Sequence, residues 1–334
     1  MRFAYIGLGR AARLYHFPSL ARVPEAVAVG GFDQSPEQRL SWQAETAMPV
    51  LSTVEELLAL RPDVVVVATP PATHAATCIA ALEAGAHVVC EKPFVETVAA
   101  ADAVLAAAAR AGRQVAVNHQ FRAKPMFSAV AEGIHSGAYG RLAFCQLWQL
   151  MDLAPWEEPT AWRADMARKT LLEGGVHLVD LMLVLFDELP EAVYARHSSG
   201  FHDDPEADAV QLLTLEFPGG RLGQITIDRL CRGGTRYFEV RADCERASLR
   251  GSLGGRAFLR LGRKRAESGL ARLDFGATGL AWVETGLSRK VLARSPRGVD
   301  TTATGDLLLG MVKAFRSGAE PPSSAREARN VIAV

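Results

Sequence analysis

Short apolar runs alternate with amphipathic or alanine-rich segments through the first 120 residues. The runs typical of strands are 3–6, 26–32, 63–68, the first half of 86–94, and 114–117. The segments typical of helices are 53–60, 72–84 and 97–111. Continuous valine in the run 63–68 indicates a strand buried on both faces. This alternation predicts a doubly wound parallel sheet, and we expect a first domain over residues 1–120.

After residue 120 the pattern becomes rich in strands. The runs typical of strands, many of them separated by glycine and aspartate turns, are 142–151, 193–197, 209–217, 221–228, 237–241 and 247–249. The segments typical of helices are one ending near 135, then 171–186, 305–317 and 323–334. Thr304 is a candidate N-cap, and the last helix is expected to pack back on the first domain. We therefore expect a second, α+β domain over residues 121–334.

The first strand runs directly into a G-x-G-x-x-A pattern. Gly7 permits a tight turn, Gly9 lets a pyrophosphate approach the backbone, and the small Ala12 lets the following helix pack on the strand. The phosphates would bind at the N-terminus of that helix, where free N–H groups and the helix dipole favour anions. The residues expected at this phosphate site are Gly7, Gly9, Arg10, Ala11 and Ala12.

An acidic residue, Asp33, closes the second strand a little over 20 positions beyond the glycines. At this position a carboxylate accepts hydrogen bonds from the ribose hydroxyls and repels a 2′-phosphate. Gln34 and Ser35 follow, and the first arginine beyond them is Arg39. Asp33 therefore favours NAD as the cofactor, and NADP is also possible. The alternative to ribose binding is that Asp33 is the N-cap of a helix.

A charged pair, Glu91 and Lys92, follows the apolar half of 86–94 directly. Ions are costly to place beside an apolar core. In an open parallel sheet, ligands bind at the carboxyl ends of the strands. Thr69 and Pro70 break the previous strand at the same edge. Lys92 is therefore a candidate site residue, and the alternative is a lysine with its ammonium in water.

The helix 171–186 carries the second group of candidates. Glu173, His177 and Asp180 are spaced four and three residues apart, so an α-helix places them on one face. A histidine beside carboxylates on a partly buried face is a candidate general acid or base. The alternative is a structural histidine whose hydrogen bonds are satisfied within the core.

Composition excludes several classes of function. Apolar residues make up 49% and charged residues 22% of the chain, and the formal net charge is zero, so no global field attracts nucleic acid or an anionic membrane. The five cysteines are scattered, which fits free thiols in a reducing compartment and argues against a zinc site. No run has the length of a signal peptide or a membrane span, so a cytoplasmic protein without a metal is expected.

Taken together, these motifs resemble the signature of the Gfo/Idh/MocA oxidoreductases, a family that includes glucose–fructose oxidoreductase and inositol dehydrogenase. The resemblance rests on the order of the glycine turn, Asp33, T-P-P-A-T-H at 69–74 and E-K-P at 91–93, and it extends over nearly the whole chain. It implies a Rossmann domain followed by a large, mostly antiparallel sheet. In the family that sheet usually carries helices on one face and a partner subunit on the other, so a homodimer or homotetramer is expected.

The resemblance also assigns roles to single residues. His177 takes the place of the catalytic histidine and Asp180 that of the aspartate after it. The residues that it adds to the cofactor site are Thr69, Pro70, His74, Glu91 and Lys92. Arg122 matches the arginine of the family's R-x-x-P crossover. Trp162 and Arg163 follow in a loop whose aromatic residues would either stack on a sugar or fill the core.

Two departures from the family pattern affect the second domain. Arg168 and Lys169 stand where the family has a glycine run, and they add bulk and positive charge that indicate an altered or acidic substrate. Glu173 replaces the usual catalytic-site aspartate, so the carboxylate is kept but lies one methylene further out.

These residues predict NAD-dependent oxidation of a secondary alcohol, or its reverse, on a sugar, cyclitol or related polyol. His177 would take the hydroxyl proton, and Lys92 would stabilise charge on the oxygen. Glu173 would orient His177 or bind another hydroxyl. Two alternatives keep the fold: a regulator that binds NAD(P) without turnover, and a glycosidase that uses bound NAD transiently.

Overall fold

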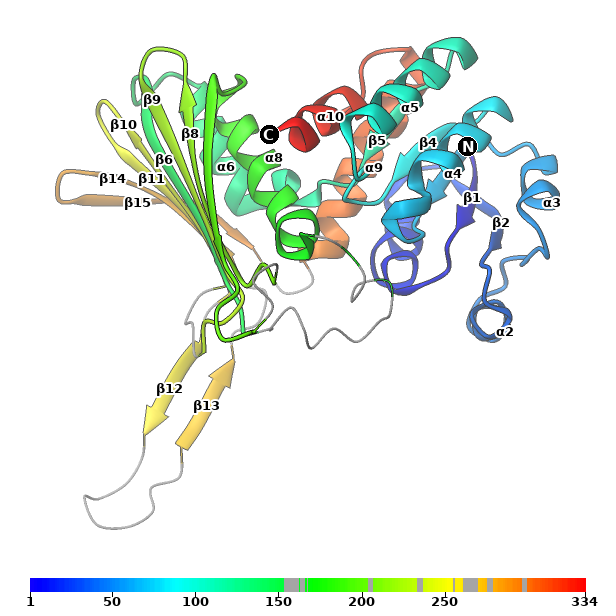
Figure 1. The fold of residues 1–334 in the computed structure, drawn as a ribbon, viewed down its shortest axis with the longest axis horizontal. Helices are drawn as coiled ribbons and strands as arrows, with labels where there is room; N and C mark the ends of the chain where they lie inside the picture. The colour runs from blue at the N-terminus through cyan, green and yellow to red at the C-terminus, as the bar shows by residue number, and fades with distance from the viewer. Residues whose placement is uncertain are drawn as a thin grey trace. The chain divides into compact units, whose positions relative to one another are not determined.

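The computed structural model describes residues 1–152, 162, 166, 168–203, 207–232, 237–254, 256–260, 270–274, 279–295 and 299–334 (Figure 1). These residues form two compact units. The first combines residues 1–123 with 300–334, and the second comprises 124–299. The sequence pattern had placed 300–334 in the second domain, with only its last helix packing back on the first.

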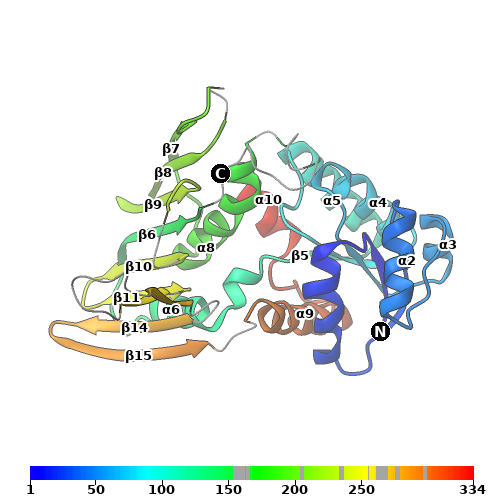
Figure 2. The same cartoon turned by 90° about the horizontal axis from the view of Figure 1, so that it is seen from below.

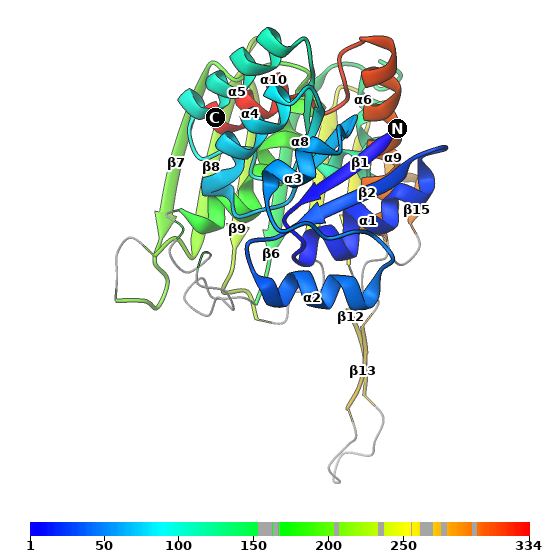
Figure 3. The same ribbon diagram turned by 90° about the vertical axis from the view of Figure 1, so that its right-hand side faces the viewer.

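The first unit is built on a five-stranded parallel sheet with the order β2-β1-β3-β4-β5. Figure 3 shows β1 and β2 side by side. The strands are β1 (Arg2–Ile6), β2 (Val27–Phe32), β3 (Val64–Val67), β4 (His87–Cys90) and β5 (Val115–Val117). Since β2 and β3 lie on opposite sides of β1, the strand order reverses there, and the carboxyl end of β1 is the expected ligand crevice.

Helical segments complete the first unit. They are η1 (Ala12–His16), α1 (Phe17–Ser19), η2 (Leu20–Arg22), α2 (Pro36–Glu45), α3 (Val54–Ala59), η3 (Pro71–Thr73), α4 (His74–Glu83), α5 (Val98–Ala111), η4 (Gln120–Ala123), α9 (Val299–Ser317) and α10 (Ala325–Ala333). Helix α9 begins five residues before Thr304, which therefore lies within the helix and is not its N-cap. Helix α2, which the sequence analysis did not assign, begins after the N-cap Ser35.

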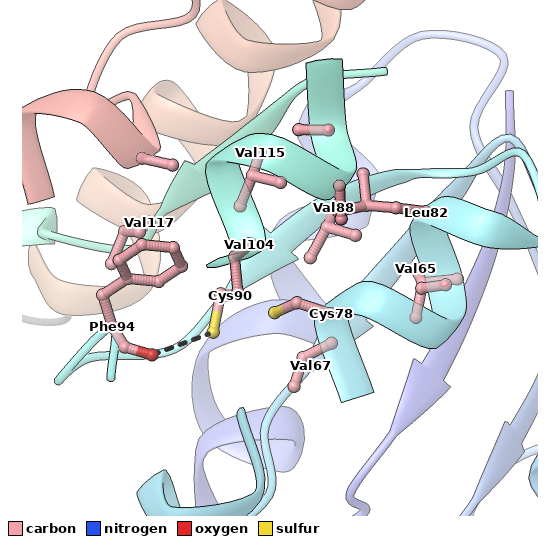
Figure 4. Close-up of a cluster of buried hydrophobic side chains, with 14 of the residues drawn as sticks. Val65, Val67, Cys78, Leu82, Val88, Cys90, Phe94, Val104, Val115 and Val117 are labelled. Atoms are coloured by element: carbon pink, nitrogen blue, oxygen red, sulfur yellow. Dashed lines mark hydrogen bonds between the residues drawn. The ribbon is translucent and has the colours of Figure 1, made fainter. Parts of the chain in front are cut away.

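Apolar side chains cover both faces of the parallel sheet. Val65 and Val67 contribute to a cluster with α4, α5 and α10, part of which is shown in Figure 4. Val64 and Val66 face the other cluster, which includes apolar residues of α9 such as Leu308. This burial on two faces confirms what the valine run predicts, and the packing of α9 explains why residues 300–334 belong to the first unit.

The second unit is built on an eight-stranded sheet with the order β15-β14-β11-β10-β6-β9-β8-β7, which Figure 2 shows along its length. All its neighbouring strands pair antiparallel except β6 and β9. The strands are β6 (Leu142–Leu150), β7 (Ala192–Ser198), β8 (Val210–Phe217), β9 (Arg221–Asp228), β10 (Phe238–Cys244), β11 (Ser248–Leu253), β14 (Gly279–Thr285) and β15 (Ser288–Ser295). A parallel sheet with a separate, mostly antiparallel one confirms the predicted fold class.

Helices pack on the eight-stranded sheet. Helix α6 (Pro125–His135) contacts β11, β14 and β15, whereas α8 (Val176–Phe186) contacts β6 and β9. The segment η5 (Thr170–Gly175) leads into α8. Strands β12 (Arg256–Arg260) and β13 (Leu270–Asp274) pair only with each other among the described residues. No helix within the described ranges has both the length and the hydropathy that a bilayer span requires.

Candidate functional site

The two glycines of the first turn have different surroundings. Gly7 has a φ of 92°, and an added Cβ would lie 2.5 Å from the carbonyl oxygen of Ala68. The turn therefore presses against the carboxyl end of β3, which only glycine allows. An added Cβ on Gly9 would have no atom within 4 Å. This open space fits the close approach of a cofactor's pyrophosphate.

The helix after the turn begins with a π-helical segment. Ala12 is fully buried against the sheet, as its expected packing role requires, and Ala11 immediately precedes the segment. Arg10 is exposed at the turn. π-Helical turns are rare and are found frequently at functional sites. The segment ends on His16, a buried residue to which the sequence analysis gave no role.

Asp33 is held by two backbone N–H groups. Its Oδ2 accepts a hydrogen bond from Leu8 N at 2.8 Å, and its Oδ1 accepts one from Ser35 N at 2.8 Å. An ionised carboxylate has about four acceptor positions, so capacity remains for ribose hydroxyls. The N-cap of α2 is Ser35, not Asp33. The carboxylate instead joins the end of β2 to the glycine turn.

His74 lies between the loops that follow β3 and β4. It is fully buried, with Nε2 2.8 Å from Thr69 O and Nδ1 2.9 Å from Pro93 O. Both ring nitrogens therefore face backbone carbonyls, and the place of His74 in the cofactor site stays a prediction. His74 joins the two loops. Thr69 and Pro70 are half-buried beside it.

Glu91 is a buried carboxylate with three N–H donors. Its Oε1 accepts a hydrogen bond from Asn118 Nδ2 at 2.7 Å and lies 2.7 Å from His16 Nε2, while its Oε2 accepts one from Lys92 N at 3.0 Å. Burial raises the pKa of Glu91, but the hydrogen bond and charge of His16, the charge of Lys92 and the Asn118 amide together lower it to about 2. Glu91 is therefore ionised at neutral pH.

Lys92 follows this carboxylate at the carboxyl end of β4. Its side chain is half-buried, and its peptide bond to Pro93 is cis. The chain on both sides is fixed, because Glu91 N donates to Val67 O at 2.8 Å and Phe94 is fully buried. In Figure 4 Phe94 lies beside Cys90, whose thiol contacts the Phe94 carbonyl. Lys92 thus carries its positive charge on an anchored loop next to an anion.

Arg122 has a partner within the first unit. Its Nη1 lies 2.8 Å from Glu327 Oε1 of α10, and its side chain is largely buried. Part of its hydrogen-bonding capacity is therefore used inside the protein, and its expected role in substrate binding stays a prediction.

The segment that carries His177 is not a continuous α-helix. Residues Thr170–Gly175 are π-helical, and the α-helix begins at Val176. The predicted common face therefore applies to His177 and Asp180, which are both buried and lie in the α-helix. Glu173 is half-buried in the π-helical part, where α-helical spacing does not hold.

Two glycines let this segment approach the sheet. An added Cβ on Gly174 would lie 2.9 Å from Gln149 Oε1 of β6, and one on Gly175 would lie 3.0 Å from a methyl group of Ile227 of β9. The close packing fixes the start of α8 against two neighbouring strands.

Asp208 holds the start of this segment from outside it. The side chain is buried, and Oδ2 accepts hydrogen bonds from Thr170 N at 2.9 Å and Leu171 N at 3.4 Å. Burial raises the pKa of Asp208, and these N–H groups and the charge of Arg229 only partly oppose that effect. Asp208 was not predicted, because its local signal in the sequence is only a position just before an apolar strand.

Arg168 adopts a backbone conformation that favours glycine. Its φ is 50°, and its side chain is exposed. The chain therefore keeps a left-handed conformation at a position where the motif resemblance places a glycine run. Lys169 follows at the start of η5. Trp162 is half-buried, whereas Arg163 lies outside the described residues.

The glycine turn, the acidic end of β2 and the strand order define a dinucleotide-binding Rossmann unit. The family model for the NAD-binding Rossmann fold of an oxidoreductase family (GFO/IDH/MocA) matches residues 1–119. The model of the GFO/IDH/MocA C-terminal domain matches residues 127–250. The chain belongs to the GFO/IDH/MocA family of NAD(P)-dependent oxidoreductases, which confirms the family predicted from the motifs.

Named relatives and solved structures agree with this family. The chain is 30% identical over 230 residues to 1,5-anhydro-D-fructose reductase of Ensifer adhaerens, covering 67% of this chain and 68% of that protein. It is 28% identical to inositol 2-dehydrogenase 4 of Saccharopolyspora erythraea over 75% of each chain. The fold matches the WlbA dehydrogenase of Bordetella pertussis, solved with NADH and UDP-GlcNAcA, with a TM-score of 0.77, 22% identity and coverage of 99% and 93%.

Proposed function

We propose that the protein is an NAD-dependent dehydrogenase or reductase that interconverts a secondary alcohol and a ketone on a sugar, cyclitol or related polyol. The names of the relatives support this substrate class. The observation that carries the proposal is the anchored Lys92, set beside the ionised Glu91 at the carboxyl end of β4.

The surroundings of Asp33 support NAD over NADP. Its carboxylate lies at the end of β2 and places negative charge where a 2′-phosphate would bind. Arg39, the nearest arginine in the sequence, donates to Asp33 O at 2.6 Å and Gln34 O at 3.3 Å, so its guanidinium is engaged with backbone carbonyls. The dissociation constants of NAD and NADP for wild type and Asp33→Ser test this preference, which the variant should weaken.

The proposed chemistry divides between two residues. A nicotinamide cofactor held at the glycine turn and Asp33 would supply the hydride transfer. Lys92 hydrogen-bonds the substrate oxygen and stabilises the negative charge that develops on it. His177, oriented within α8, accepts the hydroxyl proton in the oxidative direction and returns it in the reductive direction. Glu173 orients His177 or binds another hydroxyl of the substrate.

Arg168 and Lys169 support a substrate with an acidic substituent. Arg168 is exposed, directly before the π-helical segment that carries Glu173. A guanidinium pairs with a carboxylate or phosphate through two parallel hydrogen bonds. A sugar acid should therefore have a lower KM than the matching neutral sugar, and Arg168→Gly should reduce that difference.

A second copy of the chain is the proposed partner of the eight-stranded sheet. Three large apolar side chains on neighbouring strands are exposed in the isolated chain: Tyr194 by 60%, Leu212 by 48% and Leu222 by 40%. An apolar surface of this kind is typical of an interface between proteins. Analytical ultracentrifugation of wild type and Leu212→Glu tests this assembly, and a mass that is monomeric for both would contradict it.

The test of the function is nicotinamide absorbance on mixing the protein with NAD and a panel of sugars, inositols and sugar acids. Wild type should form NADH with one class, and Lys92→Ala should lose most of that rate. Gly9→Ala is the matched control for the cofactor, because it should abolish NAD binding with little effect on folding. NAD binding without turnover of any panel member would favour the regulator, and hydrolysis of a glycoside without net NADH would favour the glycosidase.

A further inference from the structure

We propose that His16 and Asn118 are positioning residues that hold the Glu91 carboxylate beside Lys92 and so keep the Lys92 ammonium charged and in place. The proposal rests on the proposed catalytic role of Lys92. It assigns a function to two buried polar residues that the cofactor motifs leave unexplained.

The three side chains form one buried hydrogen-bonded cluster. His16 is 1% exposed, Asn118 2% and Glu91 7%. His16 Nε2 and Asn118 Nδ2 each lie 2.7 Å from the same carboxylate oxygen, Oε1. Because an ionised carboxylate only accepts hydrogen bonds, Nε2 of His16 must carry the hydrogen. The other oxygen accepts the backbone N–H of Lys92, so both oxygens are fixed.

The cluster joins three elements that are far apart in the sequence. His16 ends the helical segment that follows the glycine turn, 75 residues before Glu91. Asn118 directly follows β5, and its backbone N–H donates to Cys90 O at 2.8 Å. Glu91 itself is tied to β3 through Val67. The Lys92 loop is therefore fixed to the helix of the phosphate site and to two neighbouring strands.

The negative charge of Glu91 acts on the ionisable groups around it, and Lys92 is one of them. His16 faces the carboxylate from η1 and Lys92 from its own loop. Tyr15 on η1 and Cys90 on β4 also lie within range of its charge, which acts with burial to keep both groups protonated. A fixed anion next to an ammonium stabilises the charged form of that ammonium. Loss of the anion should therefore let Lys92 lose its proton at a lower pH.

The proposed network is tested by the pH dependence of Lys92 in a set of variants. The lysines are methylated with ¹³C-formaldehyde, and the NMR signal of Lys92 is assigned with Lys92→Arg and titrated. In Glu91→Gln its titration midpoint should fall by about 1 to 2 pH units. Glu96→Gln is the matched control, because Glu96 is exposed and lies in the same loop. The alkaline limb of the kcat/KM profile should move in the same direction.

Two His16 variants separate positioning from mere folding. The amide nitrogen of Gln can replace Nε2 of His16 as a donor, whereas Leu cannot. His16→Leu should therefore lower the Lys92 midpoint by less than Glu91→Gln does, because the carboxylate keeps its charge but loses a donor that holds it. We expect kcat to fall about tenfold, and His16→Gln should restore most of both. If Glu91→Gln does not fold, this pair of His16 variants still tests whether the network positions Glu91 beside Lys92. Lower stability of these variants without any shift of the Lys92 signal would overturn the proposal.

The lysine titration needs no substrate, so it distinguishes the two proposals. A shifted Lys92 signal in a protein that turns over no substrate would support the network and contradict the proposed function. Turnover that depends on Lys92, with an unshifted signal in Glu91→Gln, would support the function and overturn the network.

Discussion

Two buried carboxylates, one in each unit, behave in opposite ways. Glu91 lies beside Lys92 in the first unit, and Asp208 lies at the start of the segment that leads to His177 in the second. Both accept backbone N–H groups, and burial raises the pKa of both. Yet the pKa of Glu91 ends at about 2, below its ordinary value of 4.5, whereas that of Asp208 ends above its ordinary value of 3.8.

The partners of the two carboxylates explain the difference. Glu91 receives hydrogen bonds of 3.0 Å or shorter on both oxygens, and His16 and Lys92 both act to lower its pKa. Among the described residues, Asp208 accepts one short backbone hydrogen bond, from Thr170 N, and its contacts with Leu171 N and the Gln211 amide measure 3.4 and 3.5 Å. The charge of Arg229 also acts on Asp208, but these partners do not overcome its burial. The comparison teaches that burial alone does not set the charge of a carboxylate, because the number and charge of its donors decide whether burial is overcome.

The largest effect is expected from replacing Lys92, the cation beside the ionised Glu91. Lys92→Met should reduce kcat by roughly 10²–10³-fold, as the loss of one electrostatic donor to a developing oxyanion does in other enzymes. Steady-state turnover with the substrate found in the panel measures it. The half-buried side chain should leave the melting temperature nearly unchanged. A loss smaller than tenfold would show that the anchored charge is not used in catalysis.

Glu91 should contribute stability that depends on pH. Its folded pKa lies below its ordinary value, so its contribution is complete above pH 4.5 and is lost as the pH falls towards 2. A shift of this size corresponds to about 3 kcal/mol. Urea unfolding of wild type and Glu91→Gln between about pH 6 and pH 3 measures it. The advantage of wild type should shrink as the pH falls, and a constant difference would contradict the low pKa.

Asp208 should show the opposite sign. Its pKa is raised in the folded state, so the stability it contributes is complete below pH 3.8 and is lost as the pH rises through the folded pKa. Asp208→Asn keeps an acceptor for Thr170 N and cannot ionise, so the variant should gain stability relative to wild type as the pH rises. The exposed Asp203→Asn is the control in the same urea series. The comparison with Glu91 fails if both variants change in the same direction.

The smallest effect is expected at Arg168. A non-glycine residue in the left-handed region costs about 1 kcal/mol, so Arg168→Gly should raise the free energy of unfolding by no more than that amount. The same variant should raise KM for an acidic substrate and leave that for its neutral analogue unchanged. A loss of stability would show that the Arg168 side chain makes contacts that outweigh the backbone strain.

Much of the first unit could be predicted because its signals are local. Gly7, Gly9, Asp33 and Lys92 each lie next to a strand along the chain, and the carboxyl ends of parallel strands meet at one edge. Other features could not be predicted in this way. The residues next to His74 in the chain do not reveal that both of its ring nitrogens face carbonyls of two loops.

The second unit was less predictable at its site. Apolar alternation located most of the strands, because each strand needs one face against the helices. The π-helical turn before His177 leaves no periodic pattern of apolar residues in the sequence. It depends on Gly174 and Gly175, which pack against strands β6 and β9. Asp208 reads in the sequence only as a turn residue before a strand, although its carboxylate binds N–H groups 38 and 37 residues away.

The sequence by itself determined the parallel sheet, the nucleotide-binding turn and the family. These depend on short-range order: apolar period, glycine position, and charged residues that directly follow buried strands. Only the tertiary structure decided which side chain meets which carboxylate. His16 reaches Glu91 across 75 residues, and Asp208 reaches Thr170 across 38. Whether a carboxylate keeps or loses its charge depends on these distant donors, because hydrogen bonds and burial act through space and not along the chain.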